Sequence, residues 1–68
     1  EKGEGGEVNY EAAMQAYARA CALNGALGCY NLGRMYRYGI GQEVDEDRAK
    51  RAYRKGCDLA DRDACRML

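Results

Sequence analysis

The sequence predicts an all-α fold, an α/α solenoid of two 36-residue helix-turn-helix repeats braced by disulfides. The first observation behind this prediction is a repeated spacing: Cys21 and Cys29 lie eight residues apart, as do Cys57 and Cys65. The second observation is that one pair follows the other by 36 residues. The same step brings further identical residues into line, at Gly3/Gly39, Gly5/Gly41, Glu7/Glu43, Val8/Val44, Ala13/Ala49, Ala16/Ala52, Tyr17/Tyr53, Leu23/Leu59 and Leu32/Leu68. Repeats of this length are typical of helix pairs that complete their core by stacking on one another.

The repeat divides the chain into three parts. Residues 1–7 are expected to form a glycine-rich loop from a preceding repeat, residues 8–43 the first repeat, and residues 44–68 a second repeat that is truncated at its C-terminal end. Hydrophobic periodicity places helices at about 10–23 and 26–38 in the first repeat, and at about 46–59 and 62–68 in the second. The chain begins with Glu1 rather than Met, which favours a piece of a longer parent chain with further repeats.

Each expected helix has a start signal or a stop signal. Asn9, Asp45 and Asp61 precede the first, third and fourth helices, and such side chains accept the free amide hydrogens of a first helical turn. Asn24-Gly25 is expected to end the first helix, and Gly39 the second, because glycine tolerates the left-handed conformation that follows a helix.

The expected helices also have one buried side each. The predicted stripes follow the i, i+3, i+4, i+7 spacing of a helix: Ala13, Ala16, Tyr17, Ala20 and Cys21; Cys29, Leu32, Gly33 and Tyr36; Ala49, Ala52, Tyr53, Gly56 and Cys57. In the first and third helices these residues are small apart from one tyrosine each. The pattern predicts that neighbouring helices approach closely and that the tyrosine fills the larger gap.

Three motifs give the chain a resemblance to a known family. The end of each first helix reads Tyr-x-x-Ala/Gly-Cys-x-Leu at 17–23 and 53–59, the second helix opens with Cys-Tyr-x-Leu-Gly-x-Met-Tyr at 29–36, and Gly-x-Gly-x-x-Val-Asp follows at 39–45. In these motifs the chain resembles the cysteine-rich branch of the Sel-like repeat family, which is related to the tetratricopeptide repeats. The resemblance covers residues 3–68. It departs from the family at Ala60, where glycine is favoured, and at the last helix, which lacks its Leu-Gly-x-x-Tyr continuation.

Four interpretations of the cysteines are open. The resemblance implies disulfides Cys21–Cys29 and Cys57–Cys65, and the repeat favours the same pairing because one bridge geometry then serves both copies. Four cysteines allow three pairings in general. The alternatives are reduced thiols in the core, a four-cysteine zinc site, which usually has shorter ligand spacings, and a catalytic dithiol, for which no Cys-x-x-Cys motif is present.

Composition argues against several classes of function. The net charge is zero, which disfavours a general nucleic-acid or membrane-surface binder. No stretch reaches the roughly 18 apolar residues of a membrane span, so we expect no membrane insertion. The charge is uneven, however, since residues 1–32 carry two basic and four acidic side chains, whereas residues 33–68 carry nine and seven.

The sequence offers little for catalysis. It contains no His, Ser or Thr, so cysteine is its conventional nucleophile and nothing nearby would activate it. Its carboxylates are expected to cap helices or to form i,i+4 pairs on a solvated face, in Glu46–Lys50, Asp47–Arg51 and Arg54–Asp58. We therefore expect no enzyme activity, cofactor or metal. The resemblance allows one enzymatic alternative, a β-lactam-binding or weakly hydrolytic protein.

The expected function is protein interaction. Helical repeats bind partners along the groove lined by the first helix of each unit. Residues beside the buried stripes then line this groove: Glu11, Met14, Gln15, Ala18, Asp47, Lys50, Arg51 and Arg54. The groove changes from mildly apolar to basic, which predicts a peptide or protein partner with an apolar and an acidic portion. The alternative is a structural spacer or cap of a longer array. Disulfides would imply a periplasmic or secreted protein, or one of the mitochondrial intermembrane space.

Overall fold

The described part of the chain, residues 9–68 of a computed structural model, is entirely helical. Its four helices are α1 (Tyr10–Ala22), α2 (Ala26–Tyr38), α3 (Glu46–Asp58) and α4 (Arg62–Arg66), and none of these residues forms a strand. The all-α prediction is confirmed, and the helices begin where the sequence places them. The loop expected over residues 1–7 lies outside the described residues.

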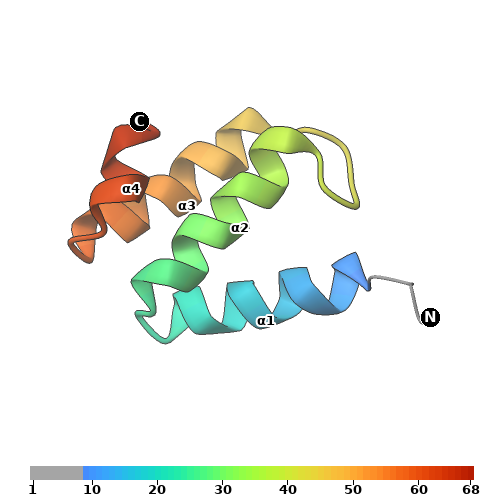
Figure 1. Cartoon of the computed structure of the whole chain (residues 1–68), viewed down its shortest axis with the longest axis horizontal. Coiled ribbons are helices and arrows are strands. Elements are labelled where there is room, and N and C mark those ends of the chain that lie inside the picture. The colour runs from blue at the N-terminus through green and yellow to red at the C-terminus, as the bar shows by residue number, and fades with distance from the viewer. Residues whose placement is uncertain (1–8) are drawn as a thin grey trace.

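Helix α2 lies at the centre of the molecule. Figure 1 shows that α1 and α2 diverge from their short connection, that α3 runs beside α2, and that α4 folds back across the end of α3. The most extensive helix contact is between α2 and α3, followed by that between α1 and α2. Two of the four helices therefore depend on α2 for most of their packing.

The three predicted N-caps are confirmed. Asn9 accepts a hydrogen bond from the Ala12 amide at 2.9 Å, and Asp45 accepts one from the Arg48 amide at 3.1 Å. Asp61 accepts from two amides of the first turn of α4. Each cap satisfies backbone donors that have no partner within the helix.

The ends of α1 and α3 differ from the prediction. Asn24 rather than Gly25 takes the left-handed conformation after α1, with φ of 69°. Gly25 instead precedes α2 with φ of −82°. Ala60 takes the same conformation after α3, with φ of 71°. In both places the amide of the left-handed residue and the amide after it bond back into the last turn of the helix, and this bonding pattern needs one left-handed residue whatever its type.

The buried core is small and centred on α3. Ala49, Tyr53 and Ala64 are completely buried or nearly so, and Tyr30, Tyr36 and Met67 pack around them. Gly33 of α2 lies against the Tyr53 ring so closely that a Cβ at Gly33 would be 2.7 Å from a ring carbon. The predicted close approach of helices is therefore present between α2 and α3.

The predicted stripe of α1 is only partly buried. Cys21 is buried and Ala13, Tyr17 and Ala20 are half-buried, but Ala16 is exposed. Within residues 9–68, α1 packs mainly against α2, whereas α3 has α2 on one side and α4 on another. The side of α1 that corresponds to the α2-facing side of α3 therefore has no helix against it among these residues.

Two disulfides join the helices of each pair. Cys21 bonds to Cys29 and Cys57 bonds to Cys65, with the same Cα–Cα distance of 4.5 Å in both. The predicted pairing is confirmed, and no described cysteine is free. Each bridge ties the end of one helix to the start of the next.

Removal of either disulfide is expected to destabilise the chain strongly. In the chain-entropy model a loop of this size contributes about 2–3 kcal/mol. The double variants Cys21→Ala/Cys29→Ala and Cys57→Ala/Cys65→Ala should each lose about that amount in urea unfolding followed by circular dichroism. The reduced wild-type chain, which lacks both bridges, serves as the control and should be less stable than either variant. Either double variant unfolding at the wild-type urea concentration would contradict the expectation.

Replacement of Ala60 by glycine is expected to stabilise the fold. An alanine in the left-handed conformation is strained by about 1 kcal/mol, and glycine adopts it freely. Ala60→Gly should raise the free energy of unfolding by about 0.5–1 kcal/mol. The matched control is Ala18→Gly in the middle of α1, which should lower it by about 1 kcal/mol. The strain argument fails if both variants are destabilised alike.

Candidate functional site

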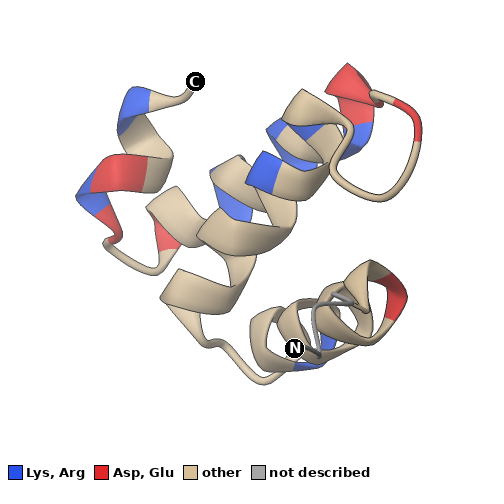
Figure 2. Ribbon diagram, turned by 45° about the vertical axis from the view of Figure 1, so that its right-hand side comes forward, with Lys and Arg blue, Asp and Glu red and all other residues tan. Residues whose placement is uncertain are grey.

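Charged side chains are sorted along the helices. Figure 2 shows acidic residues gathered where α1, α3 and α4 begin, whereas basic residues occupy much of α3. Acidic residues are favourable at helix N-termini because the exposed amides there carry partial positive charge. The result is one helix, α3, with a predominantly basic body.

The expected i,i+4 ion pairs of α3 do not form. Among residues 9–68 the ion pairs are Arg48 with Asp45, at 3.4 Å, and Arg66 with Asp63, at 3.8 Å, both at i,i+3 spacing. The predicted pairs Glu46–Lys50, Asp47–Arg51 and Arg54–Asp58 are therefore wrong, although their residues are exposed as predicted. Exposed pairs contribute little free energy, so these side chains stay solvated instead.

A basic hollow lies between the end of α1, the middle of α2 and α3. It has a volume of about 320 Å³, and we call it the basic hollow. Its lining residues are Cys21, Leu32, Tyr36, Arg48, Arg51, Ala52 and Lys55. Three cations of α3 thus lie beside apolar side chains of α2, an arrangement that suits a ligand with both carboxylate and apolar groups.

Two neighbours interact with the Arg48 guanidinium. The Arg48 guanidinium lies over the Tyr36 ring, 5.8 Å from its centre. The Tyr36 side chain, followed by the Asp45 carboxylate, raises the pKa of Arg48 above its usual value. Lys55 and Arg51 form no ion pair with any residue from 9 to 68. The hollow therefore presents cations that residues 9–68 neutralise only at Arg48.

The residues predicted to line a binding groove are mostly elsewhere. On α1, Glu11, Gln15 and Ala18 are exposed and Met14 is half-buried; on α3, Asp47, Lys50, Arg51 and Arg54 are exposed. Of these residues, the wall of the basic hollow contains Arg51. The structure does not bring the predicted α1 residues into the hollow, and no finding tests the predicted groove itself.

The basic hollow is lined by a different face of α3 from the one predicted to line the groove. Arg48, Arg51, Ala52 and Lys55 follow the i, i+3, i+4, i+7 spacing and so lie on one side of α3. Each α3 residue of the predicted groove precedes a residue of this face by one position in the sequence. The position of α2 decides which of the two faces lines the hollow. The spacing of residues within α3 does not reveal that position.

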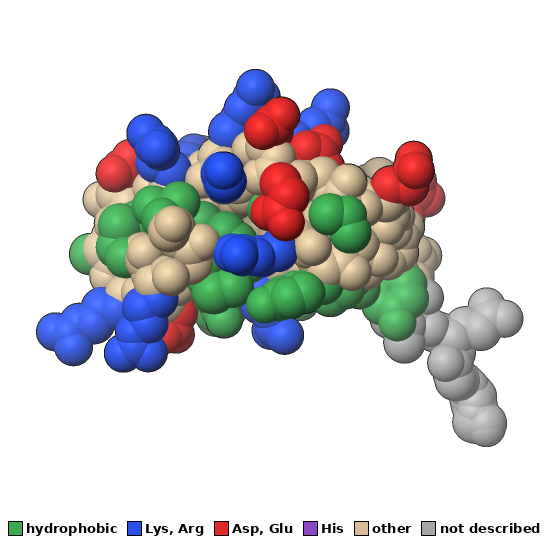
Figure 3. Space-filling view, turned by 90° about the horizontal axis from the view of Figure 1, so that it is seen from above, with side chains coloured by type: hydrophobic (Ala, Val, Ile, Leu, Met, Phe, Trp, Pro, Cys, Tyr) green, Lys and Arg blue, Asp and Glu red, His purple; other side chains and the backbone are tan. Residues whose placement is uncertain are grey.

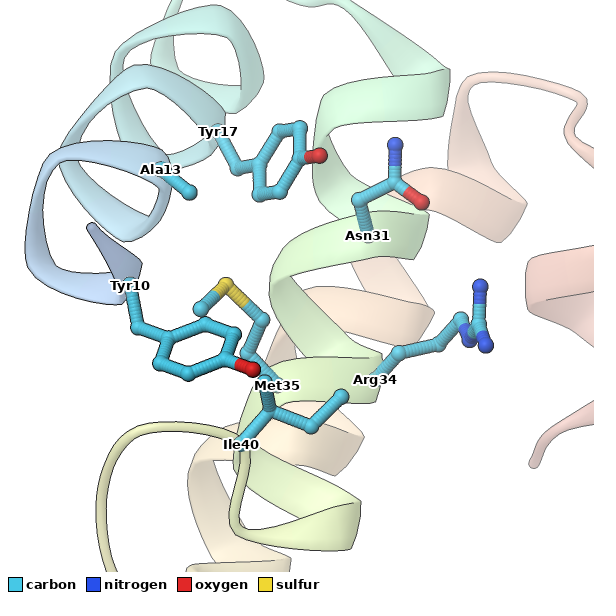
Figure 4. Close-up of a pocket in the computed structure, with 7 residues that line it drawn as sticks. All are labelled: Tyr10, Ala13, Tyr17, Asn31, Arg34, Met35 and Ile40. Carbon is cyan, nitrogen blue, oxygen red and sulfur yellow. The ribbon is translucent and has the colours of Figure 1, made fainter. Parts of the chain in front are cut away.

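A second opening lies between α1 and α2, on the other side of their contact. This opening, which we call the tyrosine cleft, has a volume of about 210 Å³. It is lined by Tyr10, Ala13, Tyr17, Asn31, Arg34, Met35 and Ile40. Figure 4 shows the Tyr10 and Tyr17 rings reaching from α1 towards α2, with Met35 and Ile40 beside the Tyr10 ring. The Arg34 side chain extends away from the two rings, so the cleft is largely apolar.

Apolar side chains also reach the surface elsewhere. In the view of Figure 3 they form separate patches, and Lys and Arg side chains project between and around them. The large exposed apolar residues are Tyr10, Leu23, Leu27, Tyr38, Val44 and Leu68. Scattered apolar residues of this kind are normal on protein surfaces.

The described residues offer no conventional catalytic or metal-binding cluster. Residues 9–68 contain no group of three or more His, Cys, Asp or Glu side chains placed to hold a metal ion. All four cysteines are consumed in disulfides, so the free-thiol, zinc and dithiol alternatives do not apply. None of the helices in this part of the chain is long and apolar enough to cross a membrane.

The Tyr53 hydroxyl is an unusual buried polar group. The side chain is completely buried, and its hydroxyl has no hydrogen-bond partner among the described residues. Burial is the main cause that raises the pKa of Tyr53 above its usual value near 10; neighbouring Tyr38 and Tyr30 raise it further, whereas Arg37 and Arg34 oppose the shift. The neutral form is therefore the one that the core accepts.

Comparison with protein-family models, curated proteins and solved structures finds no match for this chain.

Replacement of Tyr53 by phenylalanine is expected to stabilise the chain. The change removes a hydroxyl that is buried without a partner, which should raise the free energy of unfolding by about 1 kcal/mol near neutral pH. The free energy of unfolding of the variant should also fall less at high pH than that of the wild type. In the wild type the unfolded chain ionises Tyr53 near pH 10 while the folded chain keeps it neutral, so stability present below that pH is lost as the pH rises.

The measurement is urea unfolding of both chains at about pH 7 and pH 10.5. Tyr38→Phe, at an exposed tyrosine, is the matched control and should leave both values near those of the wild type. A Tyr53→Phe chain with the same alkaline loss as the wild type would contradict the assignment.

Proposed function

We propose that the chain is a two-repeat α/α solenoid of the Sel-like repeat kind that acts as a non-catalytic protein-interaction module. Its ligand is an extended peptide or a partner protein with acidic and apolar groups. The main contact surface is the basic hollow, which replaces the predicted groove as the centre of the site and shares Arg51 with it.

The observation that carries this proposal is the make-up of the basic hollow. Arg48, Arg51 and Lys55 line it on one side, and Leu32 and Tyr36 form its apolar floor. Two of these cations, Arg51 and Lys55, have no carboxylate partner among residues 9–68. Peptides bind well where charge complementarity guides them and apolar contacts hold them.

The repeat assignment is supported by features that recur after 36 residues. Both disulfides have the same Cα–Cα distance, and Asn9 and Asp45 cap α1 and α3 in the same manner. Asn24 and Ala60 take the same left-handed conformation. Helix α4 begins at Arg62, 36 residues after the start of α2 at Ala26. These agreements favour two copies of one helix-turn-helix unit.

A catalytic function is disfavoured by the same residues. The chain has no serine, threonine or histidine, and its thiols are joined in disulfides. A covalent β-lactam intermediate would need one of these nucleophiles. The two disulfides indicate an oxidising environment outside the cytosol. We propose the periplasm or secretion, with the mitochondrial intermembrane space as the alternative.

The proposal predicts that an acidic peptide binds the basic hollow. A fluorescein-labelled peptide of alternating glutamate and leucine should bind with an affinity that falls as salt is added, because its charges are screened. Its glutamine counterpart should bind at least about tenfold more weakly. Fluorescence polarisation gives both affinities.

Two charge-reversed variants locate the contact. Arg51→Glu/Lys55→Glu should weaken binding of the acidic peptide at least about tenfold. Lys50→Glu/Arg54→Glu changes the net charge equally but lies outside the lining of the basic hollow, so it should have a smaller effect. Equal losses in the two variants would show attraction by net charge alone, and the hollow would not be the site.

A further inference from the structure

The tyrosine cleft has a counterpart in the other half of the chain. The residues 36 positions after Ala13, Tyr17 and Asn31 are Ala49, Tyr53 and Met67. Ala49 and Tyr53 are core residues, and Met67 packs against them. The surface that forms part of the open cleft between α1 and α2 thus corresponds to a surface between α3 and α4 that is buried.

Helix α2 is what covers the second surface. Its residue Gly33 lies on the Tyr53 ring, and the Tyr30 ring packs beside Tyr53 with centres 5.9 Å apart. Arg37 of the same helix donates a hydrogen bond to the Met67 carbonyl oxygen at 2.9 Å. A helix that fills such a cleft therefore needs an aromatic residue, a glycine three positions later and a donor four positions after that.

The first surface lacks this cover among the described residues. Tyr17 is half-buried where Tyr53 is fully buried, and Ala16 is exposed where Ala52 is only 6 % exposed. The side chains are the same, so their different burial reflects different neighbours, and those of Tyr53 include Gly33 and Tyr30 of α2.

We propose that the tyrosine cleft binds an amphipathic helix of a partner protein with the α2 pattern, Tyr-x-x-Gly-x-x-x-Arg. The glycine of the partner helix lies on the Tyr17 ring, and its aromatic residue packs beside that ring. One side of the partner helix covers Ala16. This is a second interaction surface, and it does not depend on the basic hollow. The proposed contact repeats the one that α2 makes with α3 and α4 within the chain.

A second copy of the chain does not supply this helix from its described residues. Helix α2 of another copy is already engaged with its own α3 and α4. Helix α4 contains only Arg62–Arg66 and has no glycine. Helix α1 carries no Tyr-x-x-Gly pattern. The Tyr53-x-x-Gly56 of α3 is buried within its own copy and has Ala60, not arginine, four positions after the glycine. The helices α1–α4 of a second copy are therefore not the occupant.

The test uses the chain's own α2 sequence as the probe. A peptide of residues 26–38, with Cys29→Ala, is held helical by a covalent link between positions 31 and 35. In the intact chain these two positions line the tyrosine cleft and so face α1 rather than α3. Added to the ¹⁵N-labelled chain, the peptide should shift the amide signals of Tyr17 and Ala16 and leave those around Arg51 unchanged. The probe is basic, so the basic hollow repels it.

Matched variants separate the contact from non-specific binding. A probe with Gly33→Leu should bind at least about tenfold more weakly, because its side chain would meet the Tyr17 ring. In the labelled chain, Ala16→Arg should weaken binding similarly, whereas Ala18→Arg, on another exposed side of α1, should not. Both variants place a good helix former at an exposed helical position and should keep the fold. Neither should change binding of the acidic peptide.

Three results would overturn the proposal. One is equal binding of the glycine and leucine probes, and another is a set of shifts centred on the basic hollow. The third is concentration-dependent broadening of the Tyr17 and Ala16 signals without peptide, which would show that a second copy covers the cleft. Loss of acidic-peptide binding in Arg51→Glu/Lys55→Glu bears only on the basic hollow, so the two proposals succeed or fail separately.

Discussion

Close approach of helix backbones is the constraint on which the packing of this chain depends. A Cβ on Gly33 would lie 2.7 Å from the Tyr53 ring, and one on Gly28 would lie 2.6 Å from the Ala20 Cβ. Interiors as dense as those of proteins cannot absorb such overlaps without moving a helix. Glycine at these two positions therefore fixes the distance of α2 from both α3 and α1. The cost is a core with few large side chains, in which Tyr53 is the largest that is fully buried.

The disulfides act where this small core is weakest. A chain of 68 residues buries too little apolar surface for much stability, and small domains commonly add covalent links. Each bridge here joins two helices at their connection, which fixes the pair but not the contact between the pairs. That second contact is left to Gly33 and Tyr53. Reduction should therefore loosen each pair, whereas a larger residue at Gly33 should separate α2 from α3.

The sequence predicts local features of this fold better than features that depend on neighbours. Helix starts were predictable because Asn9, Asp45 and Asp61 bond to amides within three residues of themselves. The left-handed Ala60 was not, since it gains this conformation from bonding in the last helical turn rather than from its own preference. Ala16 and Ala52 have the same residue type but opposite burial, so no single-helix pattern could distinguish them. The basic hollow was missed for a similar reason, because the position of α2 selects which face of α3 lines it.

The two openings differ in what sets their shape. Leu32 and Tyr36 of α2 line the basic hollow, whereas Asn31 and Met35 line the tyrosine cleft. Leu32 follows Asn31 and Tyr36 follows Met35, so the two pairs lie about 100° apart around α2. From α1 the hollow takes only Cys21, which the disulfide holds, so its walls are set by the close contact between α2 and α3. The cleft takes three residues from α1, so its width follows the angle between α1 and α2.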